Sequence, residues 1–298
     1  MTYMTRQLKA DISLLAITAI WGSSFTLMKN VLDHMPSYAY LSLRFIIATV
    51  VLAIIFYRKF RLMNRKVLLY GCIIGLMLFG GMALQVSGLY FTTASNSAFI
   101  TGLSVIMVPI ISALFLRKKP DLNSVIGVIL ACVGLFFLTG GLDFRFNLGD
   151  FLTLLGALCF AMQVIFIDKF TRDQDAALLS FFQVGFAAVL YSAIWLAMDY
   201  KPVEINSTVI FTLLVTGVLG TALAFSVQTI VQKYTTPTHT ALIITAEPVF
   251  GAVFALLIPN SAGMTETLKL GTVAGCLLIL LGMLVSELKV IGNRQVEE

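Results

Sequence analysis

Apolar residues dominate the chain in long runs that contain no charged side chain. The longest run without Asp, Glu, Lys or Arg covers residues 67–116, and the others cover 12–28, 122–142, 151–167, 176–198, 205–232, 248–265 and 270–286. As one helix, the longest run would measure about 75 Å, whereas the hydrocarbon core of a membrane is about 30 Å thick. The run must therefore fold back, and the small polar stretch Thr92–Ser97 is the natural place for the turn.

These runs predict helices that cross a membrane. A transmembrane β-strand is only about ten residues long and alternates in polarity, and the runs are too continuous for that pattern. We expect an all-α polytopic membrane protein with ten transmembrane helices. They cover residues 10–31, 37–57, 67–90, 94–116, 122–140, 149–168, 176–198, 207–231, 237–258 and 267–287. The first is too long for a cleaved signal peptide, and no convincing cleavage site follows it.

The composition agrees with a membrane protein and excludes other classes. Hydrophobic residues make up 59% of the chain and charged residues 12%, and the mean hydropathy is +0.95. A soluble domain carries about 25% charged residues, so a disordered chain or a soluble two-domain enzyme is not expected. The cysteines fall inside the spans without a CxxC motif or a Cys/His cluster. We therefore expect no disulfide, no metal and no cofactor; these residues are Cys72, Cys132, Cys159 and Cys276.

The basic residues give an orientation. If the N-terminus lies inside, most of the 20 lysines and arginines fall on cytoplasmic segments. The outer segments would then hold only Lys29, Arg145, Lys201 and Lys269. This bias places both termini in the cytoplasm and explains the net charge of +5. A nucleic-acid surface is not expected, because these cations sit on short loops without interleaved aromatic residues.

The two halves of the chain are related by a weak internal repeat. An offset of 139 residues places Asp150 on Asp11 and Gln183 on Arg44. An offset of 143 places Thr235–Ala241 on Thr92–Ala98, and Gln228 on Gln85; an offset of 148 places Gly275 and Gly282 on Gly127 and Gly134. We expect five-span repeats over residues 1–140 and 141–298, joined in one membrane domain. Because five is odd, the second repeat enters the membrane inverted, which is the architecture of alternating access.

Small residues at helical spacing predict close helix packing. Gly71 and Gly75, and likewise Gly271 and Gly275, form small-xxx-small pairs. Packing within the fold is the favoured interpretation, and a homodimer interface is the alternative.

Two charged residues lie clearly inside predicted spans. Arg44 is about 10 Å from the outer end of its span, and Glu247 about 15 Å from the inner end of its own. A charge on a lipid-facing helix centre costs about 2.5–3.5 kcal/mol, so both should face a cavity or a partner. Our hypothesis is that Arg44 attracts an anionic group, such as a carboxylate. Glu247 would bind an ammonium group or a proton, and a buried structural pair is the alternative.

Other polar residues and two prolines complete the set of candidates. Trp21 offers an aromatic face and Ser24 a hydroxyl for a substrate. Pro248 and Pro109 each remove a backbone donor, so they are candidate hinges, with an ordinary kink as the alternative. Further candidates for a polar cavity are Gln85, Asn96, Gln163, Gln183, Gln228 and His239. For each of these, a hydrogen bond between helices is the open alternative.

Taken in order, these motifs resemble the drug/metabolite transporter superfamily of the EamA type. The resemblance covers nearly the whole chain. It rests on Trp21-Gly22-Ser23-Ser24-Phe25, Leu43-Arg44-Phe45, Ala94-Ser95-Asn96-Ser97-Ala98 and Glu247-Pro248. It implies an inner-membrane carrier, often an exporter of amino acids or related metabolites, with a central cavity lined by spans 1, 3, 4, 6, 8 and 9. The first repeat has Ser104-Val105 where the second has Glu247-Pro248, so the halves differ chemically.

We therefore expect a secondary transporter of a small polar metabolite, with export favoured and protons as the candidate coupling ion. No GxxxxGK[ST] phosphate-binding loop is present. A carrier of drugs, quaternary amines or other metabolites is the alternative within this class. An intramembrane enzyme is not expected, because the close acidic pair Asp173 and Asp175 lies on a short loop. A membrane sensor or partner-binding protein is the non-transport alternative.

Overall fold

The structure, a computed structural model, is a bundle of helices. It describes residues 2–32, 34–92, 94–117, 120–140, 147–198, 200, 203–257 and 269–292. Within these ranges it contains no strand. The helices are α1 (Thr2–Leu32), α2 (Ser37–Phe56), η1 (Tyr57–Leu62), α3 (Arg65–Gly88), α4 (Ala94–Gly102), α5 (Ser104–Phe115), α6 (Leu122–Leu138), α7 (Leu148–Phe170), α8 (Ala176–Met198), α9 (Ser207–Leu214), η2 (Val215–Leu223), α10 (Ala224–Val231), η3 (Gln232–Tyr234), α11 (Pro237–Ile244), α12 (Glu247–Leu257) and α13 (Leu270–Gly292). Arg145 and Lys201, which the charge argument places on outer segments, lie outside the described residues.

Several of these helices are long and apolar enough to cross a membrane. In the described part of the chain there are six: Ser37–Leu62, Arg65–Gly88, Asn96–Phe115, Leu148–Phe170, Ala176–Met198 and Ser207–Tyr234. Leu122–Leu138 and Leu270–Ser286 are shorter apolar helices. The expected all-helical, multi-pass membrane protein is thus confirmed, whereas the count of ten spans stays a prediction.

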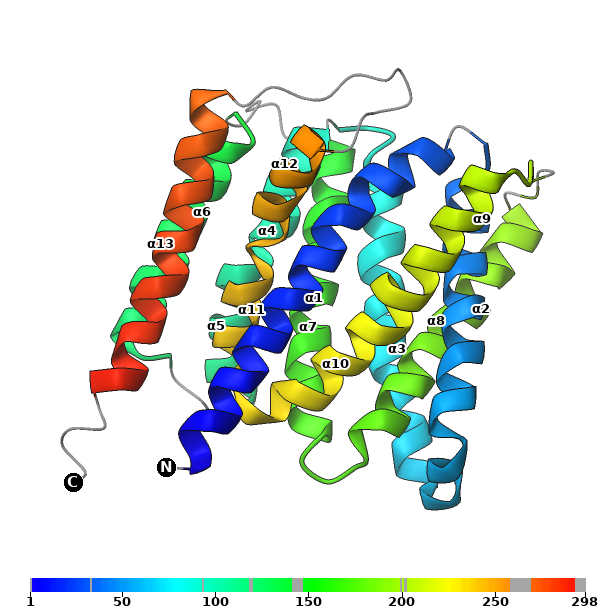
Figure 1. Cartoon of the computed structure of the whole chain (residues 1–298), viewed down its shortest axis with the longest axis horizontal. Helices are drawn as coiled ribbons and strands as arrows, with labels where there is room; N and C mark the ends of the chain where they lie inside the picture. Colours follow the sequence, from blue (N-terminus) through cyan, green and yellow to red (C-terminus); the bar gives the residue numbers. More distant parts are fainter. Residues whose placement is uncertain are drawn as a thin grey trace.

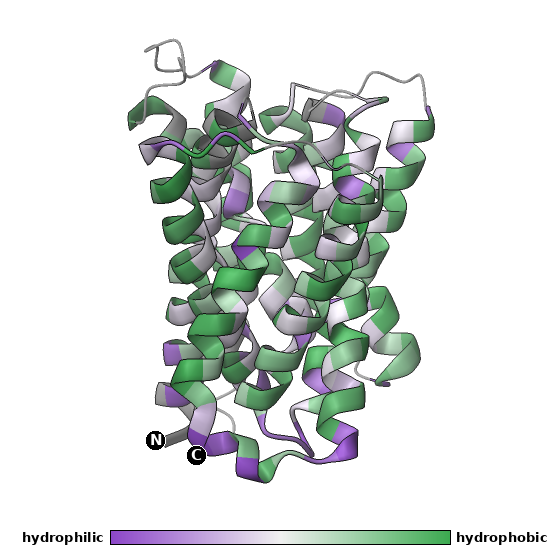
Figure 2. Cartoon of the chain, turned by 90° about the vertical axis from the view of Figure 1, so that its right-hand side faces the viewer, coloured by the Kyte–Doolittle hydropathy of each residue, from purple (hydrophilic) through white to green (hydrophobic). Residues whose placement is uncertain are grey.

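The outside of the bundle is apolar between two more polar ends. Hydrophobic residues cover the length of the helices, and hydrophilic residues gather where the helices begin and end (Figure 2). Large apolar side chains such as Ile54, Leu114 and Leu277 are exposed on the outside, as a lipid-facing surface requires. The helix α1 begins and α13 ends at the same end of the bundle (Figure 1). We call this end the N-terminal face.

Two of the predicted spans are interrupted in the structure, and a third changes its helix type. Residues 94–116 form α4 and α5 with a break at Leu103, and residues 237–258 form α11 and α12 with a break at Thr245–Ala246. Pro248 explains the second break, because it cannot donate a hydrogen bond to the carbonyl of Ile244. Residues 207–231 remain helical throughout, but their central segment η2 is a π-helix. Pro109, the other candidate hinge, lies within α5 after the first break.

The two breaks occupy equivalent places in the internal repeat. The offset of 143 residues that aligns Thr92–Ala98 with Thr235–Ala241 also aligns the end of α4 and Leu103 with Thr245 and Ala246. Two different sequences therefore interrupt the helix at the same point. Only the second has a proline close behind the break, so proline alone does not account for both.

The paired helices α6 and α13 lie side by side and run in opposite directions (Figure 1). A Cβ atom on Gly127 would lie 2.6 Å from the carbonyl oxygen of Gly282, and one on Gly134 would lie 2.7 Å from that of Gly275. The offset of 148 makes Gly127 equivalent to Gly275, and Gly134 equivalent to Gly282. Gly127 therefore contacts Gly282, the counterpart of Gly134, and Gly134 contacts Gly275, the counterpart of Gly127. A two-fold axis produces this contact pattern.

The small-xxx-small pairs are used for packing inside the chain. A Cβ atom on Gly71 would lie 2.3 Å from Cβ of Phe182, and one on Gly75 would lie 2.6 Å from the carbonyl oxygen of Gln183. These contacts bring α3 directly against α8. Gly275 meets α6 in the same way, with the carbonyl oxygen of Gly134 at 2.5 Å from its added Cβ.

Asp175 links η1 to the start of α8 at the N-terminal face. Its Oδ2 accepts a hydrogen bond of 2.7 Å from Lys59 Nζ, and its Oδ1 accepts the N–H groups of Ala177 and Leu178 at 3.0 and 3.1 Å. Partial burial raises the pKa of Asp175, but the hydrogen bonds from Lys59 and the two N–H groups lower it further, and the net pKa lies below its usual value. The folded protein therefore favours the charged carboxylate.

We predict that Asp175→Ala lowers the unfolding free energy by about 1 kcal/mol, because α8 loses its N-terminal cap. Asp175→Asn keeps a capping oxygen and should lose only the charge-dependent part. The pKa of Asp175 is lower in the folded protein than in the unfolded chain. The charge-dependent stabilisation is therefore fully present above the unfolded-state pKa of about 3.9, and it is lost as the pH falls through the folded-state pKa. Thermal unfolding in detergent at several pH values measures both effects. An Asp175→Ala protein as stable as the wild type would contradict the capping role.

Candidate functional site

Arg44 is buried in the bundle and fastens α2 to the π-helix η2. Its side chain is 4% exposed. The Nε atom donates to Thr221 Oγ1 at 2.6 Å, and Nη2 donates to the carbonyl oxygen of Gly220 at 3.1 Å. The guanidinium carbon also lies 6.0 Å from the centre of the Tyr40 ring. A guanidinium group has five N–H donors, so these two hydrogen bonds position the group without using all its donors.

The π-helix provides the acceptors that hold this arrangement. The carbonyl oxygen of Gly220 also accepts Nε1–H of Trp21 at 2.8 Å. Thr221 Oγ1 donates to the carbonyl oxygen of Thr216, five residues earlier, at 2.9 Å. Widened turns of this type present backbone groups sideways and are frequent at functional sites. Three separate segments, α1, α2 and η2, therefore meet at Gly220.

Ser24 lies beside the same glycine. A Cβ atom on Gly220 would be 3.1 Å from Ser24 Oγ and 3.3 Å from Arg44 Nη2. The Ser24 hydroxyl donates to the carbonyl oxygen of Ile20 at 2.8 Å, so its oxygen remains oriented as an acceptor. A side chain at position 220 would fill the space between a hydroxyl and a guanidinium group.

Glu247 is placed next to this group by a close contact between α1 and α12. A Cβ atom on Gly22 would lie 2.6 Å from Cβ of Phe250 and 2.8 Å from the carbonyl oxygen of Glu247. Only glycine allows α1 to approach the first turn of α12 so closely. Glu247 is the first residue of α12, directly after the break in the helix. Its side chain is partly exposed, and it interacts electrostatically with Arg44.

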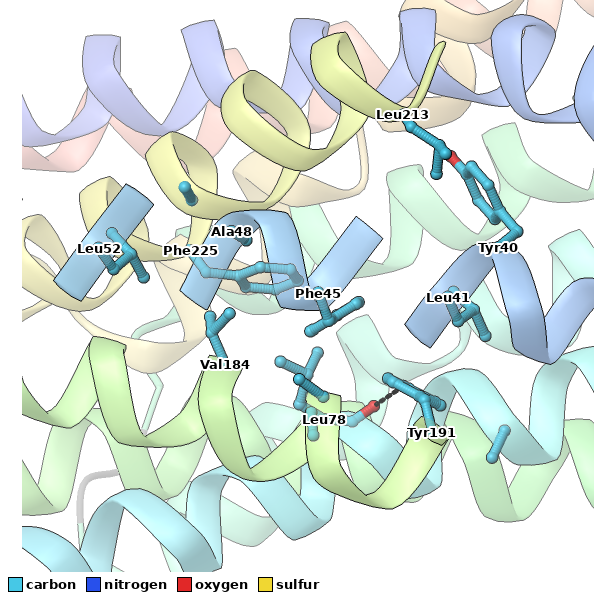
Figure 3. Close-up of a cluster of buried hydrophobic side chains, with 14 of the residues drawn as sticks. Tyr40, Leu41, Phe45, Ala48, Leu52, Leu78, Val184, Tyr191, Leu213 and Phe225 are labelled. Carbon is cyan, nitrogen blue, oxygen red and sulfur yellow. Dashed lines mark hydrogen bonds between the residues drawn. The ribbon is translucent and has the colours of Figure 1, made fainter. Parts of the chain in front are cut away.

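Aromatic side chains from α1, α2, α8 and α10 pack together in the same part of the bundle. Phe45 and Tyr191 have ring centres 5.0 Å apart, and Phe45 and Phe225 have ring centres 6.2 Å apart (Figure 3). Trp21 packs on the other side of Phe225 at 5.2 Å. Such surroundings have a low dielectric, which strengthens the interaction of charges with a bound ion or dipole. The arrangement thus presents a cation, an anion and an aromatic face within one apolar region.

The structure places several other candidate residues in separate contacts. Gln163 Nε2 donates to Gln183 Oε1 at 3.3 Å, and Gln183 Nε2 donates to Thr229 Oγ1 at 2.7 Å. This buried chain joins α7, α8 and α10. Gln85 Nε2 donates to Thr101 Oγ1 at 2.9 Å, which joins α3 to the end of α4. These hydrogen bonds of the amides support helix packing.

The remaining candidates lie in α4, α10 and α11. Asn96 is buried near the start of α4. Gln228 is 1% exposed, and its buried Oε1 has no hydrogen-bond partner among the described residues. His239 Nε2 lies 3.8 Å from Asp11 Oδ1, near the N-terminal face. Only Trp21, Ser24, Arg44 and Glu247 are brought together around Gly22 and Gly220, and the substrate-binding role of every candidate stays a prediction.

We predict that Gln183→Leu destabilises the protein by about 1–3 kcal/mol, because Gln163 and Thr229 lose a buried partner. The substitution should leave the arrangement around Arg44 in place. Thermal unfolding measures the loss of stability. The matched control is Gln174→Leu, because Gln174 lies in an exposed loop and accepts a hydrogen bond from Asn64. Equal melting temperatures for the two variants would contradict a structural role of the Gln183 chain.

Two important residues of this arrangement were not among the sequence candidates. Gly220 and Thr221 hold Arg44, but they belong to a span whose π-helical turns have no sequence signal that we recognised. The small residues Gly217, Gly220 and Thr221 in one apolar span are the nearest hint. The described residues contain no cluster of three or more His, Cys, Asp or Glu that would hold a metal ion.

Comparison with known proteins identifies relatives of this chain. The sequence model of the EamA-like transporter family matches residues 8–140 and again 147–288. A protein of Archaeoglobus fulgidus named as an uncharacterized transporter is 35% identical over 96% of this chain and 88% of its own length. The Bacillus subtilis protein YoaV, also named as an uncharacterized transporter, is 22% identical over 92% of this chain and 95% of its own.

The fold also matches a solved crystal structure with a TM-score of 0.80. The alignment covers 94% of this chain and 98% of the other, at 18% sequence identity. At this level of identity, the similarity concerns the fold alone.

Proposed function

Because the chain belongs to the EamA-like transporter family and is a multi-pass membrane protein, we propose that it is a secondary active transporter that works by alternating access. It exports a small polar metabolite, an amino acid or a related zwitterion, across the cytoplasmic membrane. Both termini lie in the cytoplasm. The observation that carries the proposal is the buried Arg44, interacting with Glu247 at the broken helix.

The reciprocal glycine contacts support the architecture that alternating access requires. Gly127 meets Gly282 and Gly134 meets Gly275 across antiparallel helices, and the helix breaks in α4–α5 and α11–α12 are equivalent under the repeat. Two five-helix repeats of opposite orientation, residues 1–140 and 141–298, have this symmetry. In such pairs, broken helices at corresponding positions surround the substrate site.

The chemistry around Gly220 favours a zwitterionic substrate. Arg44 is fixed by two hydrogen bonds, so its free N–H donors are oriented in advance toward a carboxylate. Glu247 provides the complementary charge for an ammonium group. Trp21, held by Gly220, offers an aromatic face beside them. An anion or a cation alone would satisfy only one of the two charged side chains.

Glu247 is also the candidate for proton coupling. It lies at the start of α12, is partly exposed, and interacts electrostatically with Arg44. A substrate ammonium group and a proton would both neutralise its carboxylate, so they would compete for it. Competition of this kind couples the movement of one to the opposite movement of the other.

Transport into proteoliposomes tests the proposal. The purified protein is reconstituted and offered labelled amino acids, quaternary amines and sugars, with and without a pH gradient. We expect uptake of one or more amino acids, faster with a pH gradient, and no uptake into protein-free liposomes. Uptake restricted to quaternary amines or sugars would contradict the zwitterion site. A rate independent of the pH gradient would contradict proton coupling.

A further inference from the structure

Asp11 and His239 form a buried pair of ionisable side chains near the N-terminal face. His239 Nε2 lies 3.8 Å from Asp11 Oδ1, and the two side chains are 6% and 8% exposed. Asp11 belongs to α1 in the first half of the chain, and His239 lies at the start of α11 in the second half. The pair therefore joins the two halves at a level of the bundle different from that of Arg44 and Glu247.

Hydroxyl groups continue from this pair to the surface. His239 Nδ1 lies 3.4 Å from Ser286 Oγ, and Ser286 Oγ lies 3.5 Å from Ser124 Oγ. Ser124 Oγ donates to Asp121 Oδ2 at 3.2 Å. Both serines are buried, whereas Asp121 is exposed. A hydroxyl group has one O–H donor and accepts at its lone pairs. When Asp121 is protonated and donates to Ser124, the Ser124 hydroxyl turns to Ser286 and the Ser286 hydroxyl donates to Nδ1, so the series then runs from the exposed carboxyl group to the buried imidazole.

The equivalent place in the other repeat has no such pair. The offset of 139 makes Asp150 the counterpart of Asp11, and the offset of 143 makes Asn96 the counterpart of His239. The carboxylate of Asp150 accepts the N–H of Asn147 at 3.0 Å and the hydroxyl of Thr92 as part of a helix cap. An asparagine side chain does not titrate. Of the two equivalent places, only the one at the N-terminal face therefore holds an imidazole.

We propose that Asp11 and His239 form a proton-binding site, which Asp121, Ser124 and Ser286 connect to the N-terminal face. With Nε2–H facing Asp11, Nδ1 of the neutral imidazole carries no proton and accepts the hydrogen bond from Ser286 Oγ. A proton from bulk water arrives at Asp121, and each serine accepts one proton while it passes its own to the next group. Ser286 thus protonates Nδ1, only O–H and N–H bonds change, and the imidazole gains one positive charge beside Asp11.

The elements packed around Asp11 and His239 carry further ionisable groups. The helix α5, which packs against α11, carries no ionisable side chain. Charged groups on the other neighbouring elements are Arg6 and Lys9 on α1, Arg44 on α2, Glu247 on α12, Asp150, Lys169 and the pair Asp168–Arg172 on or directly after α7, and Lys233 against the Tyr234 ring. Ionisable thiols are Cys132 on α6, Cys159 on α7 and Cys276 on α13. The charged side chains of α13 beyond Ser286 lie outside the described side chains. Protonation of His239 places a positively charged imidazolium beside the Asp11 carboxylate. The resulting ion pair holds α1 against α11.

The chain allows a direct test, since it contains only two histidines. In a His34→Gln protein labelled with ¹⁵N-histidine, the remaining imidazole signals belong to His239. We expect reversible titration in detergent between about pH 5 and 8. Asp11→Asn should reduce the proton affinity of His239 about tenfold, because a nearby opposite charge is lost, and Asp11→Glu should restore most of it. A single protonation state throughout, or the same curve with Asp11→Asn, would overturn the site.

A second pair of variants tests the connection to the surface. Ser286→Ala should leave the titration midpoint close to that of the parent but slow the exchange between the protonated and neutral signals. Ser180→Ala is the matched control, because it removes another buried hydroxyl, bonded to Ser226 at 3.0 Å. Melting temperatures show that each variant is folded. Exchange as fast with Ser286→Ala as with Ser180→Ala would overturn the serine connection. Neither measurement uses a transported substrate, so the result is independent of the proposed transport function.

Discussion

Arg44→Ala is expected to abolish transport and to lower the unfolding free energy by about 3 kcal/mol. The substitution removes two hydrogen bonds to a buried charged group, each worth about 1.5–3 kcal/mol and not fully additive. It also leaves Glu247 without the charge that it interacts with. Uptake into proteoliposomes and thermal unfolding in detergent measure the two effects.

Two controls separate the site from general effects of removing an arginine. Arg44→Lys keeps the positive charge but loses the planar fork, so we expect partial stability and weak transport. Arg61→Ala changes an exposed arginine in η1 and should alter stability by no more than about 0.5 kcal/mol. A folded Arg44→Ala protein with the uptake rate of the wild type would show that Arg44 has no role in transport.

Gly22→Ala is expected to cost about 1–3 kcal/mol of stability and most of the transport activity. Its new Cβ atom would lie 2.6 Å from Cβ of Phe250 and 2.8 Å from the backbone at Glu247 and Gly251. Backbone cannot move aside as a flexible side chain does, so α12 must shift away from α1. Because Glu247 begins α12, the shift displaces the carboxylate from Arg44.

The matched control is the same substitution at another helical glycine. A Cβ atom on Gly185 would lie 3.4 Å from Thr49 Cγ2, which is an ordinary contact. Gly185→Ala should therefore be neutral or stabilise α8 by up to about 1 kcal/mol through helix propensity. Equal stability and uptake for the two alanine variants would contradict the close approach of α1 and α12.

The sequence predicted the helical membrane fold because charge-free runs and apolar composition report directly on the environment of each segment. The same reasoning identified Arg44 and Glu247, since a charge at span depth needs a partner whatever the details of packing. The small-xxx-small pairs also predicted close helix packing from the sequence: Gly75 and Gly275 approach the backbone of another helix.

The sequence could not show how these elements combine. Gly220 and Thr221 are ordinary residues in an apolar span, and only the π-helical turn makes them the acceptors for Arg44. The break at Leu103 has no proline beside it, so it depends on packing rather than on a local signal. Gln163 and Gln228 carry the same amide group. Gln163 bonds to Gln183, whereas Oε1 of Gln228 has no hydrogen-bond partner in the described part of the chain. Such differences depend on neighbours that are distant in the sequence.

The central claim is that Arg44 and Glu247 recognise opposite ends of one substrate, and a binding cycle tests it most directly. The affinity of the purified protein is measured for a transported amino acid, for its amide, which lacks the carboxylate, and for its deaminated acid, which lacks the ammonium group. We expect Arg44→Gln and loss of the carboxylate to be non-additive by at least about 1.4 kcal/mol, a factor of ten in affinity. Glu247→Gln and loss of the ammonium group should be coupled in the same way. Additive losses in both cycles would contradict the claim.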